Sequence, residues 1–419
     1  MLNVGITGQA GFIGTHLFNY LGLKKEQVNL VSFRDEFFDD PSKLKKFVSN
    51  CDAIVHLAAL NRNNDPELIY KTNIILVEKL ISAVEEANSK PHIIFASSLQ
   101  EERDNPYGRS KTEGRIMLEK LSKKKDIPLT SLIIPNVFGP FGRPYYNSVI
   151  ATFCHQLTHG ETPRIDVDGE MKLIYVGELV ELIYQKIKDK SHKTKVPLRI
   201  PLPGGERGGF KNEKTEDNPT FAKASADAER QKTKVEEENI ETCLIDHTSE
   251  KRVSEILALL NGYKENYLEK GIFPNLDNPF EKNLFNTFVC YIDHQKFFPF
   301  ALKLNSDERG TFVETIKLNS GGQISFSTTK PGITRGNHFH TRKAERFAVI
   351  KGKAKIELRR IGTNKVLIFD LDGDKPSFVD MPIWFTHNIT NVGSGDLYTI
   401  FWINETYNAE DSDTFYEVV

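Results

Sequence analysis

Three glycines near the N-terminus, Gly8, Gly11 and Gly14, constrain the fold of this chain more than any other feature. They follow the apolar run Leu2–Thr7, which predicts a strand, and they precede a segment with helical periodicity. In a strand–turn–helix unit with this spacing, the first glycine permits a sharp turn, the second admits a ligand close to the backbone, and the third lets the helix pack on the strand. The N–H groups and the dipole at the helix N-terminus favour a diphosphate. We therefore predict a dinucleotide-binding loop, which also includes Phe12 and Ile13.

The first 200 residues alternate β-rich runs with longer helical patterns. This alternation predicts an α/β fold of the Rossmann type, a doubly wound parallel sheet covered by helices. The expected strands are Leu2–Thr7, Val28–Phe33, Ala53–Leu57, His92–Ala96 and Leu129–Ile134. Helical patterns cover Leu68–Ala87, Tyr107–Lys123 and Ser249–Asn261. The charged, aperiodic segment 205–238 lacks the apolar residues to offset its ordering entropy, so we expect a disordered surface insertion.

The second part of the chain has a different sequence pattern. A linker containing Pro274 and Pro279 is expected, and from about residue 284 short β-rich runs alternate with turn residues. This pattern predicts an all-β barrel or jelly roll. The expected strands are Gly322–Thr328, Arg346–Ile350, Ala354–Arg359, Val366–Asp370 and Leu397–Ile403. We predict two domains, residues 1–283 and 284–419.

Bulk properties exclude several classes of function. The formal net charge of −2 argues against nucleic acid or an anionic membrane as the main partner. The four cysteines form no CxxC pair, which favours reduced thiols. No run of about 18 apolar residues predicts a membrane span, and no signal-peptide pattern opens the chain. We expect a cytoplasmic protein without nucleic-acid or membrane partners.

Tyr107 and Lys111 form a YxxxK motif at the start of a predicted helix. Residues four apart share a helix face, so both side chains can point into one cleft. An isolated phenol has a pKa near 10, and a nearby ammonium stabilises its ionised form. The tyrosine can then protonate a carbonyl oxygen while hydride arrives at the carbon. The strand before this helix ends in Ser97 and Ser98, and a serine hydroxyl there can donate to the same oxygen.

Arg34 follows the second predicted strand. NAD-preferring sites usually place an acidic residue at this point, whereas an arginine suits the 2′-phosphate of NADP. Although Asp35 is adjacent, Arg34 favours NADP.

His338, His340 and Glu345 form a compact motif in the β-rich part, and His387 follows later. Two histidines separated by one residue face the same side of a strand. Three imidazoles and one carboxylate suit zinc, iron, manganese or nickel. The sequence therefore predicts a metal site within the barrel.

The glycine loop, His56-Leu57-Ala58-Ala59, Ser97-Ser98, YxxxK and Pro135–Pro140 together resemble the sugar-nucleotide branch of the extended short-chain dehydrogenase/reductase family. The resemblance implies a catalytic Ser98, the acid/base Tyr107 and its helper Lys111. It also implies a structural-catalytic role for Asn73. Leu57, Ala58 and Ala59 would line the cofactor, and Arg143 and Asn147 are candidates for contact with the substrate diphosphate. The histidine motif resembles the cupin family, although Trp384 stands where the second cupin motif usually has glycine.

The combination of both parts is similar to CapF-type bifunctional enzymes of capsular polysaccharide synthesis. This resemblance implies that the cupin domain, with zinc or another divalent metal, epimerises C3 of a UDP-4-keto-6-deoxy-N-acetylhexosamine. The reductase would then reduce C4 with NADPH to give UDP-2-acetamido-2,6-dideoxy-L-talose, a precursor of N-acetyl-L-fucosamine in capsule and O-antigen. A UDP-linked keto-sugar as partner and a homodimer as assembly are expected.

Three alternatives remain open at this point. The cupin can be a non-catalytic sugar-binding or dimerisation module behind an NADP-dependent nucleotide-sugar reductase or epimerase. The chain can be an NADP sensor without turnover, although a sensor needs no proton donor such as Tyr107. The cupin can also be an iron dioxygenase.

Overall fold

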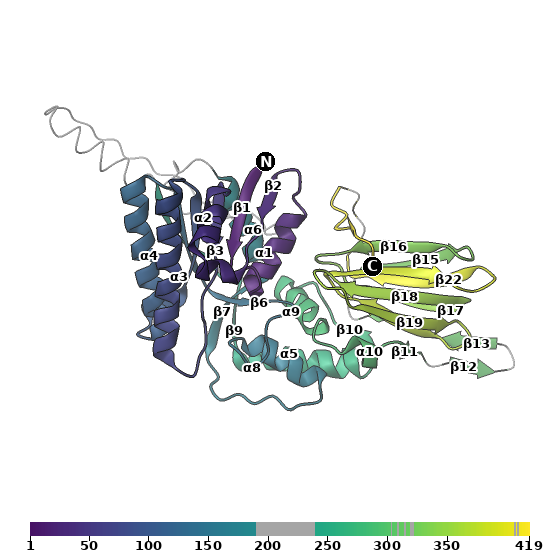
Figure 1. The fold of residues 1–419 in the computed structure, drawn as a ribbon. Helices are drawn as coiled ribbons and strands as arrows, with labels where there is room; N and C mark the ends of the chain where they lie inside the picture. The colour runs from purple at the N-terminus through teal and green to yellow at the C-terminus, as the bar shows by residue number, and fades with distance from the viewer. Residues whose placement is uncertain are drawn as a thin grey trace, which may run out of the picture. The chain divides into compact units, whose positions relative to one another are not determined.

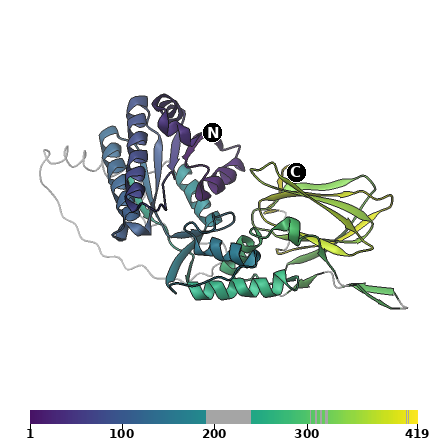
Figure 2. The ribbon, with the colours of Figure 1, turned by 60° about the horizontal axis from the view of Figure 1, so that its bottom comes forward.

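The computed structural model describes residues 1–189, 239–302, 304–307, 310–313, 316–318, 322–405, 408 and 410–419 (Figures 1 and 2). The predicted insertion 205–238 lies outside the described residues. The chain divides into two compact units. One consists of residues 1–135 and 180–246, and the other of residues 136–179 and 247–419. None of the described helices is both long and apolar enough to cross a membrane.

The first unit is built on a six-stranded parallel sheet with the order β2-β1-β3-β4-β5-β8. Its strands are β1 (Leu2–Thr7), β2 (Val28–Val31), β3 (Ala53–His56), β4 (His92–Ser98), β5 (Leu129–Ile134) and β8 (Ile240–Leu244). The strand order reverses between β1 and β3. In open α/β sheets, ligands bind outside the carboxyl ends of the strands at such a switch point.

Helices cover both faces of this sheet (Figure 1). They are α1 (Phe12–Gly22), α2 (Pro41–Ser49), α3 (Pro66–Ala87), α4 (Pro106–Lys125) and α6 (Val176–Lys188), with short helices η1 (Asp35–Asp39) and η2 (Leu99–Glu102). The predicted Rossmann-type fold is confirmed. Both α3 and α4 begin with proline, after Asp65 and Asn105, whose side chains accept backbone N–H groups of the first turn. Proline tolerates this position because the first helical N–H groups have no intrahelical partner.

The second unit contains a small sheet and several helices upstream of its β-rich part. The sheet has the order β6-β7-β9, with β6 (Asn136–Phe138), β7 (Glu170–Tyr175) and β9 (Ser249–Arg252). The helices are α5 (Val149–Thr158), α8 (Val253–Tyr263), η3 (Lys264–Leu268), α9 (Pro279–Val289) and α10 (His294–Phe297).

Three expectations for this region were wrong in detail. The predicted helix Ser249–Asn261 begins only at Val253, because its first four residues pair with β7. Pro279 starts α9 instead of belonging to a linker, since Asn278 caps the helix and accepts from Phe280 N at 2.9 Å. The β-rich part of the chain therefore begins after α10, not near residue 284. The predicted domain boundary at 283/284 falls within α9 and stays a prediction.

The remainder of the second unit is all-β, as predicted. Two five-stranded antiparallel sheets, with the orders β11-β20-β17-β22-β15 and β19-β18-β21-β16-β23, enclose an apolar core. Their strands are β11 (Phe300–Ala301), β15 (Gln323–Thr329), β16 (Thr334–Phe339), β17 (Glu345–Lys351), β18 (Lys353–Arg360), β19 (Val366–Asp372), β20 (Ser377–Met381), β21 (Phe385–Asn391), β22 (Leu397–Ile403) and β23 (Phe415–Tyr416). The shorter strands are β10 (Ile272–Phe273), β12 (Leu304–Asp307), β13 (Gly310–Val313) and β14 (Lys317–Leu318).

Candidate functional site

The glycine loop lies between β1 and α1, at the switch point of the parallel sheet. Gly8 has φ +69°, in the left-handed region that favours glycine, and its carbonyl accepts from Gly11 N at 3.0 Å. A Cβ on Gly14 would lie 2.2 Å from the Gly8 oxygen, so only glycine fits there. No side chain caps α1 at Gly11. The N–H groups of Phe12 and Ile13 at the start of α1 can therefore serve an anionic ligand.

The segment after β3 lies directly against this loop. Thr7 Oγ1 is 2.7 Å from His56 Nδ1 and accepts from Ala58 N at 3.4 Å. A Cβ on Gly8 would lie 2.7 Å from Ala58 N. The structure thus brings Leu57–Ala59 beside the glycine turn, where a dinucleotide would bind. Burial, together with the charge of Lys111, lowers the pKa of His56 to about 3, so this imidazole is neutral.

Arg34 is exposed and caps the short helix η1, shortly after the carboxyl end of β2. This end belongs to the same edge of the parallel sheet as the glycine loop, because β1 and β2 run parallel. Arg34 therefore lies at the edge of the sheet where a ligand that extends from the loop toward β2 would bind.

Tyr107 and Lys111 lie in the first turns of α4 and face the same direction. Lys111 is buried and donates from Nζ to the Ala96 carbonyl at 2.8 Å. Its ammonium lies 5.6 Å from the centre of the Tyr107 ring and 5.1 Å from that of Phe95. Burial lowers the pKa of Lys111 to about 8, so the side chain stays mainly protonated at neutral pH. The structure brings a fixed cation beside the phenol.

The two serines at the end of β4 differ in their partners. Ser97 is buried, and its hydroxyl donates to the Glu101 carboxylate, which also binds Arg115. Ser98 points to the opposite side of the strand, is only partly buried, and accepts from Gln100 N at 3.2 Å. Because Ser97 already serves a structural ion pair, the geometry favours Ser98 as a donor to a ligand.

Asn73 is buried in α3, and both polar atoms of its side-chain amide form hydrogen bonds. Its Oδ1 accepts from Leu60 N at 2.7 Å, and its Nδ2 donates to the Leu60 carbonyl at 3.2 Å and to Ser110 Oγ at 3.0 Å. Ser110 Oγ in turn donates to the Tyr107 carbonyl at 2.7 Å. Asn73 therefore connects the segment after β3 with the Tyr107 turn, which is the geometry of a positioning residue.

Arg143 and Asn147 belong to the other compact unit, in the loop between β6 and α5. Both are exposed, and the Arg143 guanidinium lies 5.3 Å from the centre of the Tyr146 ring. Their predicted contact with a substrate diphosphate stays a prediction.

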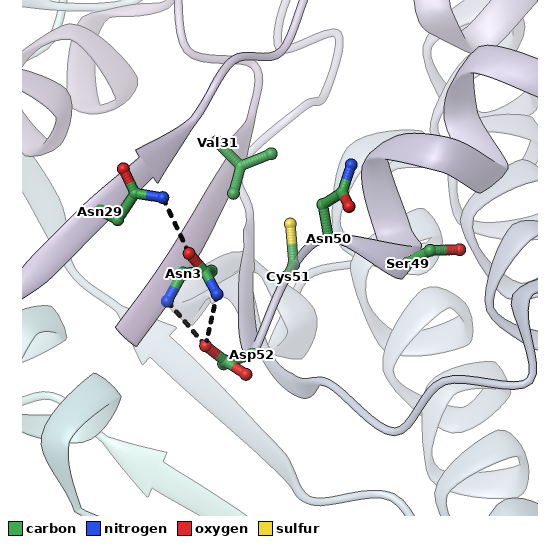
Figure 3. Close-up of a pocket in the computed structure, with 7 residues that line it drawn as sticks. All are labelled: Asn3, Asn29, Val31, Ser49, Asn50, Cys51 and Asp52. Atoms are coloured by element: carbon green, nitrogen blue, oxygen red, sulfur yellow. Dashed lines mark hydrogen bonds between the residues drawn. The ribbon is translucent and has the colours of Figure 1, made fainter. Parts of the chain in front are cut away.

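A pocket at the N-terminal ends of β1 and β3 lies away from this site (Figure 3). It is lined by Asn3, Asn29, Val31, Ser49, Asn50, Cys51 and Asp52. Its polar groups bond to one another, since Asp52 accepts from Asn3 N at 2.8 Å and Asn3 Oδ1 accepts from Asn29 Nδ2 at 2.8 Å. The glycine loop lies at the carboxyl end of β1, so this pocket is distinct from the candidate site.

The four predicted metal ligands come together between the two antiparallel sheets. Ligand atoms of His338, His340, Glu345 and His387 all lie within 4.8 Å of one another. Glu345 Oε2 is 2.9 Å from His387 Nε2 and 3.3 Å from His340 Nε2. These three atoms are buried, and among the described residues none has a hydrogen-bond partner. Buried polar atoms that converge without partners are what a divalent cation would satisfy.

The surroundings orient the imidazoles toward this cluster. His340 Nδ1 faces the Asp413 carbonyl, and His387 Nδ1 is 3.3 Å from the Phe385 carbonyl, so each Nε2 is left for the cluster. Burial lowers the pKa of His338 to about 4. Burial alone would raise the pKa of Glu345, but His340 and His387 outweigh it and hold that pKa below its usual range. An ionised carboxylate among imidazoles fits a divalent metal such as zinc.

Trp384, the departure from the cupin pattern, occupies a backbone position suited to glycine. Its φ is +61°, and its N–H donates to the His340 carbonyl at 2.8 Å. The tryptophan ring stacks on Phe339, with 5.5 Å between the ring centres. The turn therefore keeps its shape with tryptophan, and His387 still reaches the cluster.

Sequence reasoning assigned no role to Asp413, which contacts the turn between His340 and Glu345. It lies more than seventy positions beyond that turn in a segment without a motif. No sequence signal identifies it.

Comparison with known proteins matches both parts of the chain. Residues 4–196 match the NAD dependent epimerase/dehydratase family, and residues 305–415 match the polysaccharide biosynthesis C-terminal domain. A UDP-2-acetamido-2,6-beta-L-arabino-hexul-4-ose reductase from Pseudomonas aeruginosa is 29% identical over 415 residues, which are 99% of this chain and 98% of the relative.

Solved structures also match this chain along its whole length. The capsular polysaccharide assembling protein CapF from Staphylococcus aureus is 29% identical with a TM-score of 0.57, and a CapF structure with the inhibitor 3-isopropenyl-tropolone is 27% identical with a TM-score of 0.52. In both comparisons the match covers 100% of each chain.

The fold and these matches define a class, a nicotinamide-dependent enzyme of the epimerase/dehydratase type followed by a C-terminal domain of polysaccharide biosynthesis. Within that class, the predicted resemblance to CapF-type proteins is confirmed along the whole chain.

Proposed function

We propose that this chain is a two-site enzyme of nucleotide-sugar metabolism. The first unit would reduce C4 of a UDP-4-keto-6-deoxy-N-acetylhexosamine with NADPH, and the metal site between the antiparallel sheets would epimerise C3 of the same sugar. The product would be UDP-2-acetamido-2,6-dideoxy-L-talose. The observation that carries the proposal is the buried Lys111 ammonium, 5.6 Å from the centre of the Tyr107 ring, in the same unit as the glycine loop. The name of the P. aeruginosa relative, a UDP-2-acetamido-2,6-beta-L-arabino-hexul-4-ose reductase, supports the proposal.

Three residues of the first unit would carry out the reduction, and a fourth, Asn73, would position them. A bound nicotinamide supplies the hydride that reaches C4. Tyr107 would then protonate the C4 oxygen, and the Lys111 ammonium would stabilise the phenolate left behind. Ser98 would donate a hydrogen bond to the same oxygen as negative charge develops. Asn73 would hold the Tyr107 turn in place through Ser110.

The cofactor preference rests on Arg34, whose positive charge would pair with the 2′-phosphate of NADPH. Gly8, Gly11 and Gly14 would admit the pyrophosphate, with N–H groups of Phe12 and Ile13 as donors. Arg143 and Asn147 would contact the diphosphate of the sugar nucleotide.

The metal site would act on the same ketone before reduction. A C4 ketone acidifies the C3 proton, because the carbanion formed by its loss is an enolate. His338, His340, Glu345 and His387 would hold a divalent cation such as zinc, which supplies Lewis acidity to stabilise that charge. Return of a proton to the opposite face of C3 completes the epimerisation. Reduction at C4 then removes the carbonyl and fixes the new configuration.

The test separates the two steps with matched variants. The protein is incubated in deuterated water with the UDP-4-keto sugar, and C3–H exchange is followed by NMR while NADPH oxidation is followed by absorbance. We expect Tyr107→Phe to abolish NADPH oxidation and retain exchange, and Glu345→Ala to abolish exchange. Tyr70→Phe and Glu357→Ala, which change exposed or outward-facing side chains, should retain both activities.

Two outcomes would contradict the proposal. Loss of C3–H exchange in Tyr107→Phe would show that both steps use the first site. Retention of exchange in Glu345→Ala would make the β-structure a non-catalytic module, as one alternative holds.

A further inference from the structure

Asp413 lies at the centre of a hydrogen-bond network beside the metal cluster, although it is not a ligand. The side chain is buried, and its carboxylate accepts from Thr341 N at 3.0 Å, Thr341 Oγ1 at 2.6 Å and Arg342 N at 2.9 Å. A further bond comes from Lys343 N at 3.2 Å. These donors form the turn between two of the proposed ligands, His340, which follows β16, and Glu345 at the start of β17. The carboxylate therefore fixes the distance between those ligands.

The backbone of Asp413 contacts a ligand directly. Its carbonyl accepts from His340 Nδ1, which selects the tautomer whose Nε2 carries a free lone pair toward the cluster. Asp413 has φ +42°, a left-handed conformation that is uncommon for a residue with a side chain. In this conformation both the carboxylate and the carbonyl face the 340–343 turn. Such a strained backbone persists only where its surroundings hold it.

The residues around Asp413 are fastened to the strands that carry the histidines. We call residues 411–418 the latch segment. Lys343 Nζ donates to the Ser412 carbonyl at 2.6 Å, and Glu417 N donates to the Asn337 carbonyl at 2.9 Å. Within the segment, β23 pairs with β16, with Tyr416 opposite His338. The Thr386 hydroxyl, next to His387, donates to the Glu417 carbonyl. The latch segment thus contacts both strands that supply imidazoles.

We propose that Asp413 is the positioning residue of the metal site, and that the latch segment preorganises His340 and Glu345 for the cation. This inference rests on the proposed metal site and goes beyond it by assigning the determinant of its affinity. Outer-shell partners of metal ligands typically change affinity about 10- to 100-fold when they are removed. A purely structural role would instead lower the stability of the metal-free protein and leave the affinity unchanged.

The test measures zinc affinity of the full chain by competition with a chromogenic chelator. Asp413→Ala removes the carboxylate and disfavours the left-handed backbone, whereas Asp413→Gly removes only the carboxylate and keeps the carbonyl and the positive φ. We expect zinc binding about 10- to 100-fold weaker for Asp413→Ala, and a smaller loss for Asp413→Gly. Glu410→Ala, an exposed acidic neighbour, serves as the matched control and should bind zinc like the wild type. NADPH affinity should be unchanged in all variants, because the glycine loop belongs to the other unit.

Two results would overturn the inference, and they are distinguishable. Wild-type zinc affinity in folded Asp413→Ala and Asp413→Gly would refute the role of Asp413 alone. Absence of any divalent-metal binding by the wild type would refute the proposed metal site and the latch with it. If Asp413→Ala does not fold, Thr341→Val removes one donor to the carboxylate. We expect a few-fold loss of zinc affinity for that variant, and an unchanged affinity would count against the inference.

Discussion

Asp380→Asn should strongly destabilise the second unit, because it removes the counter-charge of a buried arginine. Asp380 and Arg346 form a buried, two-pronged ion pair, with Nε–Oδ1 at 2.8 Å and Nη2–Oδ2 at 2.9 Å. Their side chains are 6% and 1% exposed. The remaining Arg346 donor binds the Gly271 carbonyl at 2.7 Å, and the Tyr267 hydroxyl also donates to Asp380. The cluster joins β17 and β20 to the segment that contains η3 and β10.

The magnitude follows from the charge that the substitution leaves behind. Asparagine has nearly the shape of aspartate, so no cavity forms, but the guanidinium loses its counter-charge. Arg346 lies between aromatic rings, 3.6 Å from the centre of Phe378 and 4.6 Å from that of Phe273, where water cannot replace the carboxylate. Breaking a buried pair in this way typically costs about 3–5 kcal/mol. With a urea dependence of about 1–3 kcal/mol/M, the unfolding midpoint should fall by roughly 1–5 M.

The chain provides a selective probe for this measurement. Its two tryptophans, Trp384 and Trp402, both lie in the β-rich part, and the Trp402 ring is centred 3.9 Å from Phe273 beside the cluster. Tryptophan fluorescence in urea therefore reports the second unit. Asp372→Asn is the matched control, because its pair with Lys353 is exposed and 3.7 Å long. Exposed pairs of this kind contribute about 0–1 kcal/mol.

A double variant tests whether charge is the cause. Arg346→Met combined with Asp380→Asn leaves no uncompensated charge, and we expect it to recover most of the lost stability. A midpoint for Asp380→Asn equal to that of Asp372→Asn would refute the reasoning. A double variant as unstable as the single one would show that packing, not charge, dominates this cluster.

Three further predictions concern the first unit. Gly14→Ala should weaken NADPH binding about tenfold or more, measured by calorimetry, because the added Cβ would lie 2.2 Å from the Gly8 oxygen. Gly22→Ala, where an added Cβ would have no neighbour within 4 Å, should bind NADPH like the wild type. Equal affinities of the two variants would contradict the proposed loop. Arg34→Ala should lose about 1.5–3 kcal/mol of NADPH binding and leave NADH binding unchanged, and a parallel loss for both would contradict the role of Arg34. Burial lowers the pKa of Lys111 to about 8, so this side chain loses its positive charge as the pH rises through that value. The rate of NADPH oxidation should therefore decline above about pH 8. A flat pH–rate profile across that range would contradict the role of Lys111.

The central strands of the parallel sheet could be predicted closely because they are largely buried and stand out as apolar runs. Leu2–Thr7 and Leu129–Ile134 coincide with β1 and β5. The cluster of His338, His340, Glu345 and His387 could also be predicted, since two histidines one residue apart on a strand face one side and Glu345 follows within a short turn. In both cases the pattern of residues within short segments is enough to predict the structure.

Other features depend on partners that are distant in the sequence. The first residues of the predicted helix at Ser249 became a strand because β7 offers an edge to pair with. The preference for Ser98 over Ser97 came from the sequence, but the bond from Ser97 to Glu101 became visible only in the structure. Asp413 lies in a segment without a motif, and no sequence pattern pairs Arg346 with Asp380. The roles of these residues come from tertiary contacts that periodicity does not encode.

In the proposed function, one ketone serves two sites in order, first the metal site and then the reductase site. The most direct measurement is the isotopic composition of the product that the wild-type protein forms from the UDP-4-keto sugar and unlabelled NADPH in deuterated water. We predict deuterium at C3, where the proton is exchanged with solvent, and protium at C4, where hydride comes from the cofactor. A reduced product that retains protium at C3 would contradict the account, because C4 would then have been reduced without epimerisation at C3.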